Sequence, residues 1–229
     1  MSARQKKRPI SLLTLAFMIV LLSSCNEGGD TKTSEEERLP YIGMHEVELI
    51  KQADGEFKTD SIYYTIPKFS FINQDSVEVS HHDYLGKISV VDFFFSNCPS
   101  ICPMLSAQMV RVQESVKKQG ISANVKFLSH TVDPARDTPS RLKEYADLIG
   151  ADLSSWNFVT GKAEDLYYQA ETGYMLSAFP SDSAEGGFFH TDKIVLLDKQ
   201  MHIRGLYDGT STQSVDKLIE DIVVLIREK

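Results

Sequence analysis

The sequence lacks an excess of positive charge, an internal repeat and any hydrophobic run suited to crossing a membrane. Its 229 residues include 32 aspartates and glutamates against 24 lysines and arginines, which gives a formal net charge of −8. This acidic balance argues against binding to nucleic acid and against electrostatic attachment to anionic lipid, and it suits a basic or metal-carrying partner. Hydrophobic residues make up 42% of the chain, which is adequate for one globular domain with a core.

The apolar stretch near the N-terminus, Ile10–Leu22, has 13 residues and is too short for a comfortable transmembrane helix. Basic residues precede it and the segment Leu22–Cys25 follows it, an order typical of secretory signals. Because Leu22–Cys25 resembles the bacterial lipobox, we predict that residues 1–24 are a lipoprotein signal peptide and that Cys25 carries lipid. The protein is then lipid-anchored in the cell envelope of a bacterium, with its domain in the periplasm. The alternative is an uncleaved signal anchor in which Cys25 is incidental.

Residues 25–60 are predicted to form a lipidated tether and a candidate N-terminal hairpin, and residues 61–229 the folded domain. The polar composition from Asn26 to Arg38 is typical of a tether. Farther along, Asp54-Gly55 separates two segments that could pair as strands. Removal of the signal peptide would take away basic residues and no acidic one, so the exported chain would be more acidic still.

The spacing of apolar residues predicts an α/β domain. The nearly continuous apolar run Ile88–Phe95 is typical of a strand covered on both faces. Leu105, Met109, Val112 and Val116 recur at helical spacing after it. The other predicted strands are 64–71, 125–132, 156–160, 193–198 and 202–207, and the other predicted helices are 138–149, 163–171 and 215–226. This order is thioredoxin-like, with a central mixed β-sheet flanked by helices.

With Cys25 assigned to lipid, Cys98 and Cys102 remain for chemistry. They lie four residues apart at the expected start of a helix, so both fall on one face. This spacing suits either a reversible disulfide or two soft ligands for one metal ion. The positive end of the helix is expected to lower the thiol pKa and to favour the thiolate that either chemistry needs. A structural disulfide or two packed thiols are the alternatives, and the proline after each cysteine favours a functional loop.

Three motifs resemble, in order, those of the Sco/SenC family of copper-handling proteins, a branch of the thioredoxin-like superfamily. They are the paired Cys-Pro motif within Val91–Pro103, the segment Thr131–Pro139, which is similar to the family's VDPxRDTP loop, and the closing segment His190–Thr210. The resemblance implies that Cys98, Cys102 and His190 bind one copper ion. It also implies a role in assembling the copper centre of cytochrome c oxidase, with the copper-site subunit of the oxidase as the partner.

These residue types suit copper. Cu(I) is soft and accepts low coordination, so two thiolates and an imidazole can form a trigonal site. Zinc would usually require a fourth ligand. An acidic residue commonly precedes the family histidine, whereas this chain has Phe189 at that position. The segment 181–187 is expected to deliver His190 on a flexible loop.

Further polar residues lie near the motifs. Asp92 precedes Cys98 by six residues and could relay protons during disulfide exchange. The alternative, held equally, is that Asp92 is a carboxylate at the sheet edge that pairs with a lysine. Asp133 and Arg136–Asp137 are expected to shape the loop beside the site rather than to bind metal. His130, just before this loop, could lie near the site.

The sequence leaves two leading functions open. The first is a membrane-anchored copper metallochaperone. The second is a thiol-disulfide oxidoreductase acting on exported cysteine proteins, with Cys98 and Cys102 as its redox-active catalytic pair. Two features argue against the second function. Three residues separate the thiols instead of the usual two, and no tryptophan lies beside Cys98. A peroxide-reducing relative or a copper or redox sensor would carry the same cysteines. A thiol reductant of the exported compartment is implied, because disulfides otherwise persist there.

Overall fold

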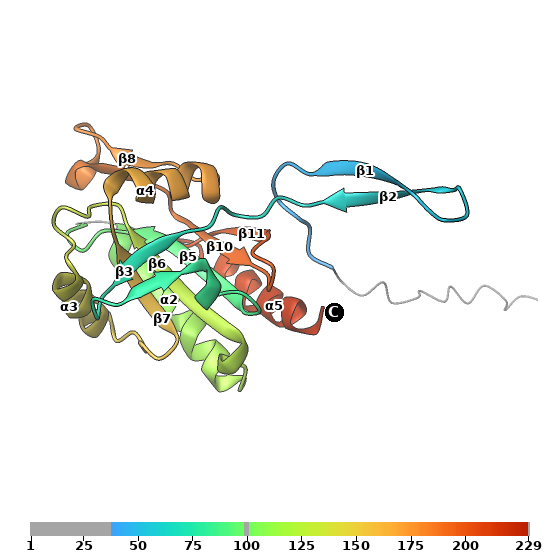
Figure 1. Ribbon diagram of the computed structural model, residues 1–229. Coiled ribbons are helices and arrows are strands. Elements are labelled where there is room, and N and C mark those ends of the chain that lie inside the picture. Colours follow the sequence, from blue (N-terminus) through green and yellow to red (C-terminus); the bar gives the residue numbers. More distant parts are fainter. Residues whose placement is uncertain (1–37, 99–100, 229) are drawn as a thin grey trace, which may run out of the picture. The chain divides into compact units, whose positions relative to one another are not determined.

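The computed structural model of the protein describes residues 38–98 and 101–228 (Figure 1). Within these ranges the side chains of Ile101, Glu185 and His190 are not described. The predicted signal peptide, the lipidation site Cys25 and most of the polar tether lie outside the described residues. In the part of the chain that is described, no helix combines the length and the apolar composition needed to cross a bilayer.

A seven-stranded sheet forms the centre of the domain (Figure 1). Its strands are β3 (Ser70–Asn73), β4 (Glu78–Ser80), β5 (Ile88–Phe94), β6 (Val125–Thr131), β7 (Trp156–Thr160), β10 (Lys193–Leu197) and β11 (Ile203–Asp208). They lie in the order β11-β10-β5-β6-β7-β3-β4. Strand β6 runs parallel to β5 and β7, and the other neighbours are antiparallel. The predicted α/β fold with a central mixed sheet is confirmed.

Helices cover both faces of this sheet. They are α2 (Ile101–Lys118), α3 (Pro139–Ile149), α4 (Ala163–Tyr168) and α5 (Thr212–Arg227). Helix α2 packs against α3 and α5, and α4 lies on the opposite side of the sheet (Figure 1). On β5, Phe93 contacts Tyr174, which follows α4, whereas its neighbour Phe94 stacks on Tyr145 of α3. Because successive side chains of a strand alternate between faces, β5 is covered on both, as its apolar run predicts.

Helix α3 begins and ends where its capping residues predict. Helix α3 starts at Pro139, and the side chain of Thr138 accepts a hydrogen bond from the backbone N–H of Arg141. It ends at Gly150, whose φ of 77° is left-handed and favours glycine. The predicted apolar stripe of α2 is fully buried, and it consists of Leu105, Met109, Val112 and Val116.

The structure departs from the prediction at the first strand of the domain. The strand predicted over 64–71 begins only at Ser70. Before it, Pro67 has no N–H to offer a sheet, and the N–H of Ile66 donates instead to the carbonyl of Met201. The short edge strand β4, which pairs with β3, was not predicted because three residues are too few to show an alternating pattern.

The segment between α4 and β10 also differs from the prediction. The helix predicted over 163–171 remains α-helical only to Tyr168 and continues as a π-helix over Gln169–Gly173. Strands β8 (Ala178–Pro180) and β9 (Phe188–His190) then pair with each other in a separate two-stranded sheet. The described side chains of these strands are largely exposed and carry no alternating apolar pattern, and sequence analysis predicted only a flexible loop over residues 181–187.

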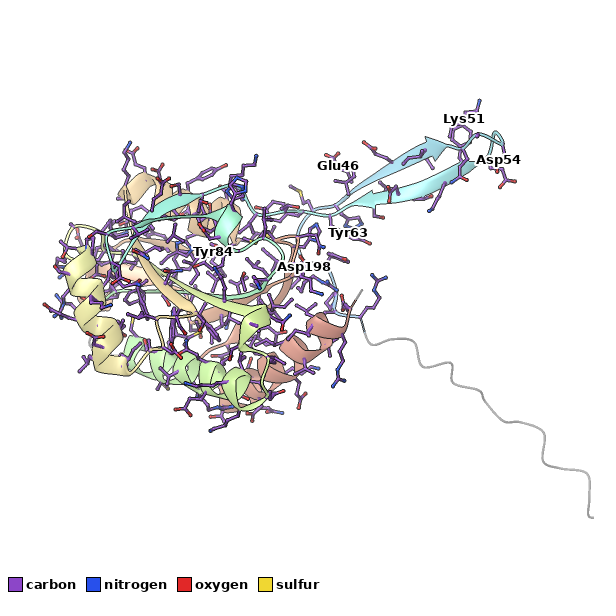
Figure 2. The ribbon with its side chains drawn as sticks, turned by 60° about the horizontal axis from the view of Figure 1, so that its bottom comes forward. Glu46, Lys51, Asp54, Tyr63, Tyr84 and Asp198 are labelled. Carbon is purple, nitrogen blue, oxygen red and sulfur yellow. The ribbon has the colours of Figure 1, made fainter. Side chains whose placement is uncertain are left out.

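The hairpin that the sequence suggested within residues 40–60 is present, and its second strand extends past residue 60 into the segment predicted as the folded domain. Strands β1 (Glu46–Lys51) and β2 (Phe57–Ile62) pair along their whole length, and Gly55 takes a left-handed φ of 90° in the turn. Figure 2 shows Lys51 and Asp54 near the tip of the hairpin and Tyr63 where the chain leaves it. Tyr63 stacks on Tyr41 at a ring-centroid distance of 3.7 Å, which ties the two chain segments at the base together.

Candidate metal centre

The predicted thiol pair lies where β5 passes into α2. Cys98 is in the connecting loop and Cys102 is in the first turn of the helix. Cys102 is 1% exposed, whereas Cys98 is half-buried. The backbone N–H of Cys102 donates to Sγ of Cys98 at 3.4 Å. The structure therefore brings the two predicted sulfur ligands together, with one sulfur more accessible than the other.

Burial, rather than the helix end, dominates the environment of the Cys102 thiol. Burial raises the pKa of the Cys102 thiol, and its hydrogen bond with Cys98 raises it further. The expectation that the helix end would favour the thiolate is therefore wrong for Cys102, because loss of water penalises the charged form more strongly there.

A buried carboxylate holds the cysteine loop, which we define as residues 95–98. Asp137 accepts hydrogen bonds from the backbone N–H of Ser96 at 3.2 Å and from its hydroxyl at 2.5 Å. Arg141 of α3 donates to the Ser96 hydroxyl at 3.1 Å and to the side-chain oxygen of Asn97 at 3.2 Å. The motif that contains Asp137 thus shapes the loop beside the thiols, as predicted. Arg141, just beyond that motif, is a contact that the sequence did not indicate.

Asp92 lies in β5, an interior strand of the sheet, and is 1% exposed. It accepts a hydrogen bond from the hydroxyl of Ser129, which in turn accepts one from the indole N–H of Trp156 at 2.8 Å. Burial raises the pKa of the Asp92 carboxyl to about 7. The alternative of an acid at the sheet edge paired with a lysine is therefore wrong. Asp92 is close enough to Cys102 for its negative charge to add to the rise in that thiol's pKa, and a proton relay stays a prediction.

His130 lies in the aromatic core. Its ring is fully buried, stacks on Phe93 at 5.0 Å between centroids, and has Nε2 3.2 Å from the hydroxyl of Tyr174. Burial lowers the pKa of His130 to about 3, so the ring is neutral near pH 7. The structure gives His130 a packing role in the aromatic core, in place of the suggested position near the thiols.

His190 is the last residue of β9, where its backbone pairs opposite Ala178. Its role as a ligand stays a prediction, because its side chain is not described. Among the side chains that are described, no three histidine, cysteine or acidic residues gather into a group able to hold a metal ion. Of the three ligands predicted for copper, the structure therefore describes the side chains of Cys98 and Cys102 only. Phe188, two residues before His190, packs on Phe95 of the cysteine loop at 5.5 Å between ring centroids, a contact that the sequence did not predict.

The two thiols lie at a strand-to-helix junction of a mixed sheet that helices cover on both faces. This arrangement defines a protein of the thioredoxin-like class. A family model described as SCO1/SenC matches residues 58–227. The chain belongs to the SCO1/SenC family. The match begins within β2, so β1 precedes the part that the family model covers.

Solved structures agree with this assignment. A SCO1/SenC family lipoprotein from Bacillus anthracis is 30% identical, with a TM-score of 0.66, over 72% of this chain and 96% of that chain. The structure of BsSco, described as having a disulfide switch and as a member of the Sco family of cytochrome c oxidase assembly proteins, is 28% identical, with a TM-score of 0.65, over 72% and 95% of the two chains. Yeast Sco1 with copper bound is 27% identical, with a TM-score of 0.56, over 69% and 88%.

Proposed function

We propose that this protein is a membrane-anchored copper metallochaperone for assembly of the copper centre of cytochrome c oxidase. Cys98, Cys102 and His190 would together bind one copper ion. The observation that carries the proposal is the contact between Cys102 and Cys98 at the start of α2. Membership of the SCO1/SenC family supports it, as do the copper-bound state of yeast Sco1 and the description of BsSco as belonging to a family of oxidase assembly proteins.

The environment of the thiols suits reversible binding of Cu(I) as cargo. Thiolate sulfur is the ligand that Cu(I) prefers, and the ion would displace a proton from each thiol as it binds. Burial of Cys102 disfavours its thiolate when no cation is present. Cys102 is thus held as a thiol until copper supplies the compensating charge. The copper-site subunit of the oxidase is the proposed acceptor, and a thiol reductant of the exported compartment would keep both sulfurs reduced.

The unequal burial of the two cysteines favours a second candidate, a thiol-disulfide oxidoreductase. The half-buried Cys98 thiolate would attack a partner's disulfide, and one partner sulfur would leave as a thiolate. The sulfur of Cys102, after losing its proton, would then attack Cys98 in the mixed disulfide. This step releases the second partner thiolate and leaves a Cys98–Cys102 disulfide. Two electrons pass to the partner, and a dithiol reductant must return them to the pair.

Substitution of His190 by alanine separates these two candidates. Copper binding needs the imidazole, whereas disulfide exchange needs only the thiolates. In copper titrations of the reduced chain we expect His190→Ala to lower affinity by at least about tenfold, since altering a residue that merely supports a ligand already costs that much. The loss should be larger for Cu(II), which prefers nitrogen. Reduction of a model disulfide should remain near the wild-type rate.

The exposed His82 provides a matched control, and His82→Ala should bind copper as the wild type does. Equal affinity in His190→Ala and wild type would remove His190 from the site. In cells limited for copper, a chaperone loses oxidase assembly with His190→Ala and recovers it when copper is added. Retained assembly would instead favour the oxidoreductase.

We also propose that lipid on Cys25 anchors the domain in the periplasm. The signal-like order of residues 1–25 supports this, as does the description of the Bacillus anthracis relative as a lipoprotein. Intact-mass analysis of protein extracted from membranes should show a chain that starts at a lipidated Cys25. Cys25→Ser should leave the chain unprocessed or release it from the membrane without lowering its thermal stability. An unmodified chain that starts at Met1 would contradict the anchor.

A further inference from the structure

The segment that leads to His190 reaches the cysteine loop through an aromatic contact. Within residues 38–98 and 101–228, strand β9 pairs with β8 alone, in a two-stranded sheet separate from the seven-stranded sheet. Phe188, the first residue of β9, is half-buried and lies against Phe95. Phe95 is completely buried and precedes Cys98 by three residues. The next residue, Phe189, instead stacks with the exposed Phe179 of β8 at 5.2 Å, so only one side of β9 contacts the cysteine loop here.

Arg136 makes a second connection to the same segment. Its guanidinium group donates to the carbonyl of Gly186 at 3.2 Å and lies 5.7 Å from the centre of the Phe188 ring. An arginine over an aromatic face is attracted by the negative charge density of the ring. Phe188 lies two residues before His190, and Gly186 lies four residues before it. Gly186 has a left-handed φ of 76°, which brings its carbonyl into the bend that precedes β9.

Arg136 is itself held in place by the protein. Its Nε donates to the carboxylate of Asp133, whose side chain is only 4% exposed. The backbone N–H of Asp133 donates to the hydroxyl of Thr131 at 2.9 Å, at the end of β6. The arginine side chain is half-exposed, so it spans from a buried anchor in the core to the segment before β9. A planar guanidinium can serve both partners at once, which a lysine ammonium does less well.

We propose that Arg136 is a positioning residue that, together with Phe188, holds the strand ending at His190 against the cysteine loop and thereby sets how long the protein retains copper. The proposal rests on the proposed function, in which His190 is the third ligand. A ligand whose backbone is already held loses less conformational freedom when the metal binds. Loss of Arg136 therefore lets His190 leave the metal more often, and a two-sulfur site releases Cu(I) faster.

The test measures transfer of Cu(I) from the full-length reduced chain to a high-affinity chelator. Arg136→Gln keeps a hydrogen-bonding side chain but removes the charge and the planar fork, and it should release copper about tenfold faster, the effect typical of altering a residue that supports a ligand. Arg136→Lys retains the charge beside Asp133 and should fall between Arg136→Gln and wild type. Arg111→Gln, which breaks an exposed ion pair with Asp216, is the matched control and should behave as wild type.

Combination with His190→Ala distinguishes positioning from general damage. If Arg136 acts through His190, adding Arg136→Gln to His190→Ala should not speed copper release further. A further tenfold acceleration in that background would overturn the proposal. If His190→Ala leaves the rate of copper release unchanged, the assignment of His190 as a ligand and this proposal both fail. If His190→Ala accelerates release and Arg136→Gln does not, only the positioning role fails.

Arg136→Gln leaves the buried Asp133 carboxylate without its arginine, and this loss could prevent folding. A second variant keeps the test decisive in that case. Phe188→Leu keeps most of the side-chain volume and removes the aromatic face that Arg136 and Phe95 contact. It should also release copper several-fold faster than wild type, and this increase should vanish in the His190→Ala background. Phe179→Leu, on the opposite side of the small sheet, is its control. Equal release from Phe188→Leu and Phe179→Leu would overturn the proposal.

Discussion

Replacing either Cys98 or Cys102 by serine is expected to lower the affinity for Cu(I) on the order of a thousandfold, or about 4 kcal/mol. A hydroxyl is a hard, neutral donor at pH 7, whereas Cu(I) prefers soft thiolate sulfur. Oxidation of the wild type to a Cys98–Cys102 disulfide removes both sulfurs together and should reduce binding at least as far. Competition between the protein and a Cu(I) chelator, under reducing and oxidising conditions, measures both effects.

Cys25→Ser is the matched control for this experiment, because it removes a cysteine that we assign to lipid rather than to metal. It should bind Cu(I) as tightly as the wild type. Serine at position 102 puts a hydroxyl into a buried site, so urea unfolding of Cys102→Ser should accompany the titration. Equal uptake of Cu(I) by the oxidised and reduced chains would show that the two thiols are not the ligands.

Asp92→Asn is expected to make the protein more stable above neutral pH. The folded-state pKa of about 7 lies above the ordinary value of 3.8, because burial disfavours the carboxylate. The folded state therefore holds this proton more tightly, and the resulting stabilisation is complete below about pH 4 and is lost as pH rises through about 7. The difference between the two pKa values corresponds to about 4 kcal/mol. An amide in the same place carries no charge at any of these pH values.

Urea unfolding at pH 4.5 and pH 8 tests this expectation. The gain in the free energy of unfolding of Asp92→Asn over wild type should be larger at pH 8, reaching up to about 4 kcal/mol less any loss from the hydrogen bond that Ser129 donates. Asp147→Asn, at an exposed position of α3, is the control for exchanging a carboxylate for an amide. A gain that is the same at both pH values would mean that Asp92 does not titrate as its burial implies.

Much of the domain could be predicted from local sequence because its strands and helices carry strong periodic signals. The run over Ile88–Phe94 is buried at every position, and α3 has both a capping threonine and a terminating glycine. Such signals depend only on a residue's neighbours along the chain. Strands β8 and β9 gave no such signal, because their pairing joins residues that face solvent or a distant loop. The same holds for β4, whose three residues pair only with β3.

The thiol pair was predictable because the residue type and the spacing directly reflect the chemistry. Residues four apart at the start of a helix lie close together, and Cys102 does contact Cys98 in the structure. The thiol pKa was not predictable from the same pattern. A helix end is visible in the sequence, but the depth of a residue in the core depends on the packing of α2 against α3 and α5. Burial therefore reversed the expected direction at Cys102.

The sequence by itself determined the class of fold, the pair of cysteines and the segment Thr131–Pro139, because each of these depends on local patterns of residues along the chain. Only the tertiary structure decided that Asp137 holds the cysteine loop, that Asp92 is a core carboxyl, and that Arg136 reaches the segment before β9. These contacts join residues between 37 and 50 positions apart in the sequence. Their partners are chosen by how strands and helices pack, and the local pattern of side chains does not encode that choice.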